Sequence, residues 1–301
     1  TVSNSYIDQQ PLHNENEIEN YMKLKRRTNF SRKGALTGCC ATLMRPGIPR
    51  HPFLAAKTPR EEMAIYHLNT HTIGRAAGHS AVAAAAYRSA SSLVDERTGE
   101  AFDFTRKGGV LSAEIVTPAG VPIPERAALW NAAEAAEKRK DARVAREWRA
   151  ALPHELNEAD RRELATRMGQ AIADRYGVAV DVCIHAPDRE GDDRNFHVHM
   201  LATTRTICAD GTLGAKAVIE LANKDRQKAG IPGTSQGDIT DIRREWAELT
   251  NEALERAGIS ARIDRRRYAH HGVALTPPTR LGSDAVAMER RGLDADRIGI
   301  H

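Results

Sequence analysis

The sequence predicts an α+β protein in which an antiparallel β-sheet is flanked by helices. Stretches rich in β-branched and aromatic residues, typical of strands, occur between amphipathic stretches with the period of a helix. The elements do not follow the regular strand–helix–strand repeat of a parallel sheet. Two strand-like stretches, 178–185 and 196–204, are separated by the short polar loop 186–195, an arrangement typical of an antiparallel hairpin.

The first half of the pattern begins with a strand over residues 64–73 (AIYHLNTHTI). Residues 80–94 are alanine-rich and begin with Ser80, a good N-cap, so they are expected to form a helix. Residues 96–118 are expected to form a short hairpin and then a strand that ends at a proline. An amphipathic pattern predicts the next helix over residues 124–142.

The second half begins with a strand over residues 145–153, which alternates and ends at a proline. Residues 157–177 are expected to form a helix that an asparagine caps and a glycine ends. After the hairpin, residues 205–237 are dotted with glycine and lysine and are expected to be a long functional loop. The last predicted helix covers residues 238–258, with Asp238 as its N-cap.

Composition and charge limit the class of protein. The chain has 301 residues, with a hydrophobic fraction of 41% and a charged fraction of 28%. No apolar run approaches the roughly 18 residues of a membrane span, and no apolar signal core is present, so we expect a cytoplasmic protein without membrane insertion. The four cysteines form no C-x-x-C pair, which argues against a disulfide framework or a cysteine zinc site. The net charge of +4 does not by itself identify a partner.

The two ends of the chain differ from the middle. Residues 1–62 are polar and weakly patterned, and we expect a poorly structured N-terminal extension. Whether this extension is native stays open, because the strand and helix pattern begins at Met63. Residues 63–301 are expected to form the functional domain, with 259–301 as a basic, irregular tail. The arginines of this tail suit a phosphate backbone, although a solvated basic surface would explain them equally well.

Three histidines flank the polar loop of the predicted hairpin. His197 and His199 are two residues apart in a strand, so their side chains point to the same face. His185 ends the partner strand, across the loop. Three imidazoles could hold one divalent ion and leave positions open for substrate or water, as in a catalytic metal site. We therefore expect a metal site here, with Val198 and Met200 facing the core; the alternative is that surface histidines lie near a hairpin by chance.

A nucleophile is harder to find. The sequence contains no nucleophile elbow, P-loop or dinucleotide-binding fingerprint. Tyr87 lies on the alanine-rich helix, where an aromatic residue is usually a core anchor, and Arg88 beside it is a candidate phosphate ligand. A phenol with a pKa near ~10 is a poor nucleophile unless a metal polarises the phosphate that it attacks. Metal, tyrosine and basic surface together indicate attack on a nucleic-acid phosphodiester, with a phosphotyrosyl bond as the product.

Several segments of the sequence resemble the MobA/MobL family of plasmid mobilization relaxases. They are MAIYHLNTHTIGRAAGHSAVAAAAYRSA (63–90), REWRAALPHEL (146–156) and IHAPDREGDDRNFHVHM (184–200). ARIDRRRYAHHGV and PPTRLGSDAVAMERRG, nearer the C-terminus, are similar to the end of the same relaxase domain. The similar segments occur in the family's order and extend over most of the chain.

The resemblance implies the fold of an HUH-type tyrosine endonuclease, named after its histidine–hydrophobic–histidine motif, with residues 63–301 as the relaxase domain. The implied activity is site- and strand-specific nicking at a plasmid transfer origin, with a covalent 5′-phosphotyrosyl link and religation after conjugative transfer. The implied cofactor is a divalent metal ion, Mn or Mg before Zn. The implied partners are single-stranded or supercoiled plasmid DNA at a transfer origin, accessory mobilization proteins and a conjugative secretion system.

The resemblance also implies roles for single residues. Tyr87 matches the nucleophile, and the three histidines match the metal ligands. Glu147 and Glu155 match acidic positions that orient a histidine or stabilise the site, with surface acids as the alternative. Arg280 stands where the family pattern has a histidine. Contacts to DNA are expected from five arginines: Arg88, Arg265, Arg266, Arg267 and Arg280.

Other functions stay open at this point. A rolling-circle replication initiator of the HUH class would use related chemistry, but such initiators usually place the tyrosine after the histidines. A non-catalytic, metal-dependent DNA-binding protein would bind origin DNA without cutting it. A metal-dependent hydrolase of a small substrate is a further alternative. Because family members often carry a C-terminal helicase or primase region, it also stays open whether the chain is a fragment.

Overall fold

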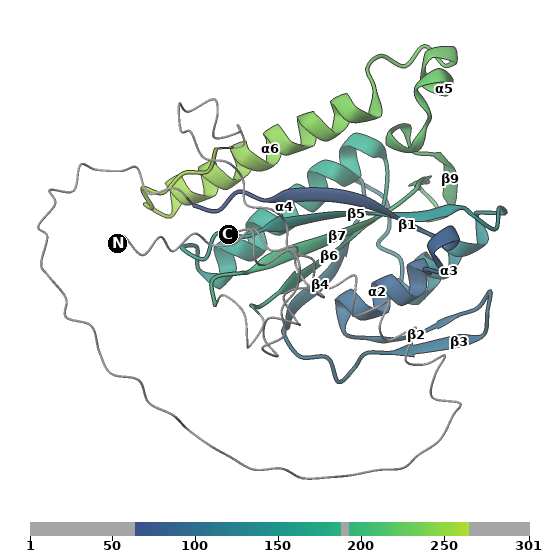
Figure 1. Ribbon diagram of the computed structural model, residues 1–301, viewed down its shortest axis with the longest axis horizontal. Helices are drawn as coiled ribbons and strands as arrows, with labels where there is room; N and C mark the ends of the chain where they lie inside the picture. Colours follow the sequence, from purple (N-terminus) through teal and green to yellow (C-terminus); the bar gives the residue numbers. More distant parts are fainter. Residues whose placement is uncertain (1–63, 188–192, 265–301) are drawn as a thin grey trace, which may run out of the picture. The chain divides into compact units, whose positions relative to one another are not determined.

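A five-stranded sheet in the order β1-β5-β7-β6-β4 is the framework of the protein (Figure 1). The computed structural model describes residues 64–187 and 193–264. All neighbouring strands of this sheet are antiparallel, and helices cover both of its faces, so the predicted α+β class is confirmed. The strands are β1 (Leu68–Gly74), β4 (Val110–Val116), β5 (Arg143–Ala151), β6 (Val180–His185) and β7 (His197–Thr203).

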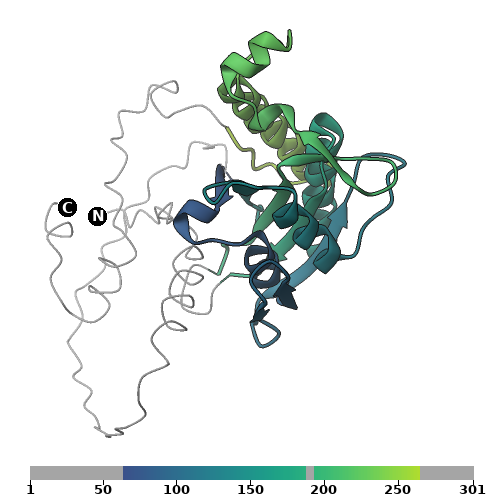
Figure 2. The same ribbon diagram turned by 90° about the vertical axis from the view of Figure 1, so that its right-hand side faces the viewer.

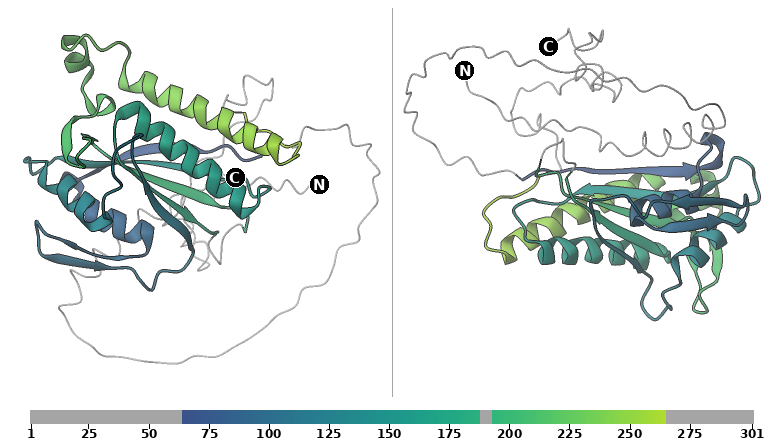
Figure 3. Two further views of the ribbon diagram at one scale, coloured as in Figure 1. Left: turned by 180° about the vertical axis from the view of Figure 1, so that it is seen from behind. Right: turned by 90° about the horizontal axis from the view of Figure 1, so that it is seen from below.

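Two long helices, α4 (Glu158–Tyr176) and α6 (Ser235–Arg256), lie side by side on one face of the sheet (Figures 1 and 3). They bury the large apolar core against alternate side chains of the central strands. Val198 and Met200 of β7 belong to this core, which confirms their predicted orientation. Because strand side chains alternate between faces, the histidines on either side of Val198 face away from the core.

Two shorter helices, α2 (Ala81–Ser89) and α3 (Arg126–Ala135), cover the opposite face. A separate small hairpin of β2 (Ser92–Asp95) and β3 (Glu100–Asp103) packs along α2 (Figure 1). Every residue of α2 except the last is buried, and most are alanines. Small side chains let this helix lie close to the sheet.

Three predicted helix boundaries are confirmed by their hydrogen bonds. Ser80 Oγ accepts hydrogen bonds of 3.2 and 3.4 Å from backbone N–H groups in the first turn of α2. The Asn157 side chain caps α4 by accepting a 2.9 Å hydrogen bond from the N–H of Asp160. Gly177 ends α4 with a φ of +65°, a left-handed conformation that costs glycine little.

Three predicted elements are shorter than expected. The helix expected over residues 124–142 spans Arg126–Ala135, because residues 136–142 form turns that lead into β5. The alanine-rich helix ends at Ser89 instead of Val94, because Ala90 adopts a left-handed conformation with a φ of 51° and the chain turns into β2. The first strand starts at Leu68 instead of residue 64, because its pairing with β5 begins only at Leu68. The local pattern did not reveal the end of the alanine-rich helix or the start of the first strand, because apolar residues continue beyond both boundaries.

Residues 205–237, expected to be a long loop, are mostly regular structure, so this prediction was wrong. They contain the hairpin of β8 (Arg205–Ile207) and β9 (Leu213–Lys216), a 3₁₀ turn at Val218–Glu220 and the helix α5 (Asn223–Lys228). Helix α5 lies beyond the N-terminal end of α6 (Figures 1 and 2). Each of these elements has three to six residues, too few to produce a recognisable period.

Helix α6 begins before its predicted cap. Thr234 Oγ1 accepts a 3.1 Å hydrogen bond from the N–H of Gly237 and is the N-cap. Asp238 lies inside the first turn, and its carboxylate accepts a 2.5 Å hydrogen bond from the buried guanidinium of Arg226. The predicted cap was wrong because this acid has a cationic partner and another side-chain oxygen stands four residues earlier.

Some predictions lie outside the described residues. These are the N-terminal extension (1–62), the basic tail beyond residue 264, and the four arginines Arg265, Arg266, Arg267 and Arg280. Within the described ranges, no helix is long and apolar enough to cross a membrane.

Candidate functional site

Polar side chains gather on the face of the sheet that is turned away from the apolar core. In the ladder between β6 and β7, His185 stands opposite His197. In the ladder between β5 and β7, Arg149 stands opposite His199. Paired residues of an antiparallel sheet point to the same face, so strand pairing brings these four side chains together.

The three histidines form a compact cluster, here called the histidine triad (His185, His197 and His199). Their ring centroids are 4.6 to 5.3 Å apart. Each offers one ring nitrogen, and these nitrogens lie within 4.8 Å of one another. All three side chains are buried.

One nitrogen of each triad histidine already faces an acceptor. His185 Nε2 lies 2.7 Å from the carbonyl oxygen of Arg88. His197 Nδ1 lies 3.0 Å from the carbonyl oxygen two residues before it. His199 Nδ1 lies 2.6 Å from a carboxylate oxygen of Glu147. Such acceptors fix the tautomer, because the facing nitrogen must carry the proton.

The second nitrogens of the triad fit a divalent metal ion. Nε2 of His197 and Nε2 of His199 are buried and have no hydrogen-bond partner in the part of the chain that the structure describes. A buried polar atom left in this state costs roughly 1–3 kcal/mol, unless another ligand takes up its lone pair. Three neutral imidazoles, each held from behind, are a donor set that first-row divalent ions accept.

Electrostatics keep the triad neutral. Burial is the main cause that lowers the pKa of His185, and it lowers the pKa of His197 to about 3. Burial also lowers the pKa of His199 to about 4, although the carboxylate of Glu147 acts in the opposite direction. Neutral imidazole is the form that binds metal, so the triad is ready to bind an ion near pH 7 without losing protons.

Glu147 of β5 connects the triad to its surroundings. It is fully buried, and its carboxylate accepts two hydrogen bonds from the guanidinium of Arg88, one of them 2.7 Å long, besides the bond from His199. His71 of β1 stands opposite Glu147 in the ladder, with Nε2 2.8 Å from the second carboxylate oxygen. Burial alone would raise the pKa of Glu147, but Arg88 and His199 hold it well below its usual range. The carboxylate thus stands where it can orient His199.

The predicted role of Arg88 needs correction. Its side chain is buried, and its three guanidinium nitrogens donate to both oxygens of Glu147 and to the carbonyl oxygen of Ala84. These donors face the protein interior, so Arg88 is not a phosphate ligand in this arrangement. Instead it fixes α2 to β5 and compensates the buried charge of Glu147.

Tyr87 lies next to this network. The carbonyl oxygen of its neighbour Arg88 contacts His185, and the guanidinium of Arg88 binds Glu147. The helix that carries Tyr87, α2, here called the tyrosine helix, is therefore joined directly to the triad. The Tyr87 side chain is 4% exposed and packs edge-on against Phe104, with ring centroids 5.2 Å apart. These contacts are those of a core anchor, and they fix the position of the ring on a helix that is joined to the triad.

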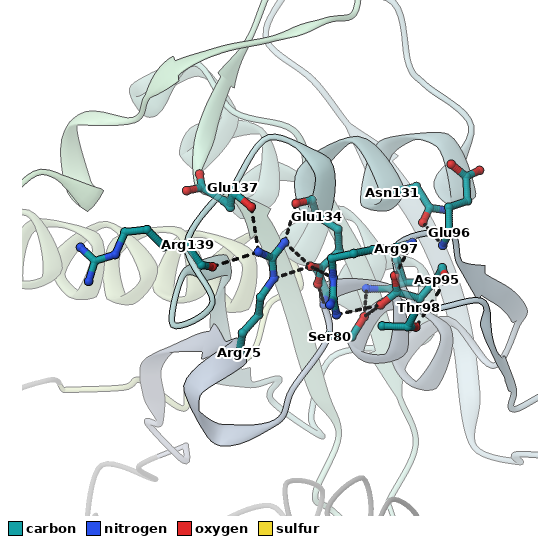
Figure 4. A network of polar contacts seen from close by, with 12 residues as sticks. Arg75, Ser80, Asp95, Glu96, Arg97, Thr98, Asn131, Glu134, Glu137 and Arg139 are labelled. Carbon is teal, nitrogen blue, oxygen red and sulfur yellow. Dashed lines mark hydrogen bonds and ion pairs between the residues drawn. The ribbon is translucent and has the colours of Figure 1, made fainter.

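Buried acids hold the other end of the tyrosine helix (Figure 4). Glu134 of α3 accepts a 2.7 Å hydrogen bond from the N–H of Ala81 and two bonds of 2.7 and 2.9 Å from the guanidinium of Arg75. Asp95 accepts a 2.8 Å hydrogen bond from the hydroxyl of Ser80. Ion pairs and hydrogen bonds therefore fix α2 at both ends.

Glu155 is not part of these contacts. It follows the end of β5, and its carboxylate lies 3.1 Å from Nδ1 of His154. The sequence analysis did not identify three residues near the triad: His71, Lys107 and Arg149. Arg149 is two residues from Glu147 in β5, so strand alternation would have placed it on the same face. The positions of His71 and Lys107 depend on strand pairing and on the course of a connection, which local sequence does not reveal.

Known proteins are similar to this chain in sequence. The sequence model of the MobA/MobL family matches residues 79–291, well over half of the chain, and this range includes the tyrosine helix, Glu147 and the triad. The chain belongs to the MobA/MobL family. Mobilization protein MobL from Acidithiobacillus ferridurans is 43% identical over 251 residues, which cover 76% of this chain and 65% of that protein.

A second relative and a solved structure are also similar to this MobA/MobL family chain. Conjugal transfer protein TraA from Rhizobium radiobacter is 33% identical over 258 residues, 79% of this chain but 23% of that protein. The chain thus spans less than two thirds of the length of these two relatives. A solved structure described as the molecular basis of vancomycin resistance transfer in Staphylococcus aureus matches with a TM-score of 0.57 and 28% identity, over 68% of this chain and 100% of that one. With the family membership, this likeness confirms the expected fold.

Proposed function

We propose that this chain is a plasmid mobilization relaxase, a metal-dependent DNA endonuclease and strand transferase that nicks one strand at a plasmid transfer origin. The observation that carries the proposal is the direct connection between the tyrosine helix and the histidine triad, through Arg88 to His185 and Glu147. A phenol on a helix that is joined to a metal-binding cluster supplies the two parts that a phosphodiester transesterification needs. Membership in the MobA/MobL family and the relatives' names, Mobilization protein MobL and Conjugal transfer protein TraA, support the same function.

In the proposed reaction, the phenol oxygen of Tyr87 attacks the phosphorus of the scissile phosphodiester. The bond from phosphorus to the 3′ oxygen breaks as the bond to the phenol oxygen forms. The phenol gives up its proton, and the departing 3′ oxygen gains one, so the products are a 5′-phosphotyrosyl strand and a free 3′-hydroxyl. The new bond is again a phosphodiester, so attack by a 3′-hydroxyl can religate the strand after transfer.

The residues around the triad hold this chemistry in place. His185, His197 and His199 would hold the divalent ion through the nitrogens that face away from their acceptors. A bound ion would draw electron density from a non-bridging phosphate oxygen and make the phosphorus more electrophilic. Glu147 would keep the proton of His199 on Nδ1. Phosphate oxygen favours Mn or Mg as the ion, and the three imidazoles also suit Zn.

The proposed substrate is supercoiled plasmid DNA that exposes a single-stranded cleavage site at its transfer origin. Accessory mobilization proteins and a conjugative secretion system are the proposed partners, and the cytoplasm is the proposed location. Residues 63–301 would form the relaxase domain and residues 1–62 a poorly structured extension. Arg265, Arg266, Arg267 and Arg280 of the tail would contact the phosphate backbone, which predicts a strong salt dependence of binding. Glu155 would support the site from the end of β5.

A nicking assay tests the function. The protein is incubated with supercoiled plasmid bearing its own transfer origin, with Mn²⁺, Mg²⁺, Zn²⁺ or a chelator. We expect relaxed plasmid with protein attached to one 5′ end, only when an ion is present. Tyr87→Phe should remove the product. Tyr66→Phe is the matched control, because Tyr66 packs against the core on the other face of the sheet and should not be needed.

The other outcomes identify the alternatives. A 5′ adduct formed by Tyr87→Phe would show that another residue is the nucleophile. Salt-dependent binding of origin DNA without any nick, whatever the ion, would indicate a non-catalytic DNA-binding protein. Nicking at a replication origin in place of the transfer origin would indicate a rolling-circle initiator.

A further inference from the structure

The connection between β3 and β4 carries a lysine over the tyrosine ring. Nζ of Lys107 lies 4.6 Å from the ring centroid of Tyr87. Phe104, three residues earlier, packs edge-on against the same ring. A 2.8 Å hydrogen bond from the N–H of Lys107 to the carbonyl oxygen of Phe104 closes the turn between them. The Lys107 side chain is only partly buried, so solvent reaches it although the ring below is covered.

Both ends of this connection are attached to the candidate site. The N–H of Phe104 donates a 3.1 Å hydrogen bond to the carbonyl oxygen of Ser91, just after the tyrosine helix. At the other end, the N–H of Ala186 donates a 2.7 Å hydrogen bond to the carbonyl oxygen of Gly109, directly after His185. Residues 104–109 therefore bridge the tyrosine helix and the histidine triad, with Lys107 between them.

The charge of Lys107 reaches the triad. Burial is the main cause that lowers the pKa of His185 and His197, and the ammonium group of Lys107 contributes to both shifts. Arg88, the cation of the tyrosine helix, faces the carboxylate of Glu147, and Arg149 stands opposite His199 on the triad face of β5. Lys107 thus brings positive charge to the place where a phosphate attacked by Tyr87 must lie.

We propose that Lys107 is a catalytic residue of this chain, which binds a non-bridging oxygen of the scissile phosphodiester during attack by Tyr87. This inference rests on the proposed nicking function. Without DNA, the ammonium group lies over the aromatic ring in a weak cation–π contact. A charge-assisted hydrogen bond to phosphate is stronger, and the flexible lysine stem allows the short movement from ring to phosphate. In the transition state, negative charge grows on the phosphate oxygens, and an ammonium group held nearby stabilises it.

The test compares substitutions at the neighbouring positions Lys107 and Arg106 in single-turnover nicking of an origin oligonucleotide. Lys107→Gln should slow nicking about 100-fold, the size of effect seen when one such donor is removed. Arg106→Gln removes the same charge from the exposed neighbouring position and should change the rate little. Lys107→Arg should recover much of the rate. Equal rates for Lys107→Gln and wild type would overturn the assignment.

A neutral substrate separates a phosphate contact from a structural role. With a methylphosphonate at the cleavage position, the non-bridging charge is absent. The ratio of the nicking rates of wild type and Lys107→Gln should then fall from about 100 toward one. An unchanged 100-fold ratio would overturn the proposal. If wild type nicks its origin DNA and Lys107→Gln nicks it equally fast, only the role of Lys107 is wrong. Wild type that never nicks its origin DNA removes the relaxase function and this inference with it.

Discussion

At the scale of single residues, Glu147 determines how the site is held. One carboxylate binds a guanidinium from α2, an imidazole from β7 and lies 2.8 Å from an imidazole of β1. A fully buried charge is tolerated only when such partners compensate the loss of water. The same residue therefore serves the stability of the protein and the orientation of His199.

Replacing Glu147 should have two measurable effects. Glu147→Gln would leave Arg88 as a buried cation without its counter-charge, at a cost of about 3 kcal/mol in the free energy of unfolding. The affinity for Mn²⁺ should fall about tenfold or more, because His199 loses its acceptor. Urea unfolding and calorimetric titration with Mn²⁺ measure the two effects.

Glu163→Gln is the matched control for this prediction. It breaks an ion pair between Glu163 and Arg256 in which both side chains are 46% exposed. Exposed pairs contribute little to stability, because water solvates both charges and salt screens them. A loss in Glu147→Gln no larger than that of the control would show that the buried network stabilises the protein little.

At the scale of elements, the position of the tyrosine helix depends on both of its ends. Helix α2 has only nine residues, too few to be stable by itself. Its N-terminal end is held by Glu134 and Asp95, and its C-terminal end by Arg88. Loosening either end should move Tyr87 relative to the triad.

Glu134→Gln tests the N-terminal end. The variant removes the negative charge that accepts from Ala81 and Arg75, so the amides of α2 should exchange with deuterium faster than in wild type. Nicking should slow while Mn²⁺ affinity stays unchanged, because the triad lies at the other end of the helix. Glu163→Gln is the control, since Glu163 lies on α4, on the other face of the sheet, in an exposed ion pair with Arg256. Unchanged exchange in α2 of Glu134→Gln would contradict the expectation.

The elements also show what sequence can predict. Helix α4 was predicted to within a residue, because its caps, Asn157 and Gly177, are local signals. The helix expected over residues 124–142 ends at Ala135, where no glycine marks the end. Short elements between residues 205 and 228 were missed for lack of any period. The triad could be predicted because its members lie beside one hairpin. The partner of Arg88 could not, because Glu147 is 59 residues further along the chain and only the folded sheet brings it near.

At the scale of the whole molecule, the sheet separates the apolar core from the proposed chemistry. One face holds the apolar core with α4 and α6, and the other holds three neutral imidazoles under α2. Burying neutral imidazoles links folding to pH, because an unfolded histidine has a pKa near ~6.5. Burial lowers the pKa of His197 to about 3 and of His199 to about 4 in the folded protein.

Acid should therefore destabilise the metal-free protein. Between pH ~6.5 and ~4 the unfolded chain binds protons that folded His197 and His199 do not, so the free energy of unfolding falls as the pH falls. The slope is at most ~1.4 kcal/mol per pH unit for each histidine. Urea unfolding in a chelator at several pH values between 7.5 and 4.5 measures it. The double variant with His197→Gln and His199→Gln should show a shallower slope. Mn²⁺ should raise the free energy of unfolding of wild type by a similar amount across this range, because the folded imidazoles that it binds are already neutral. Parallel curves for wild type and the double variant would mean that the triad does not link folding to pH.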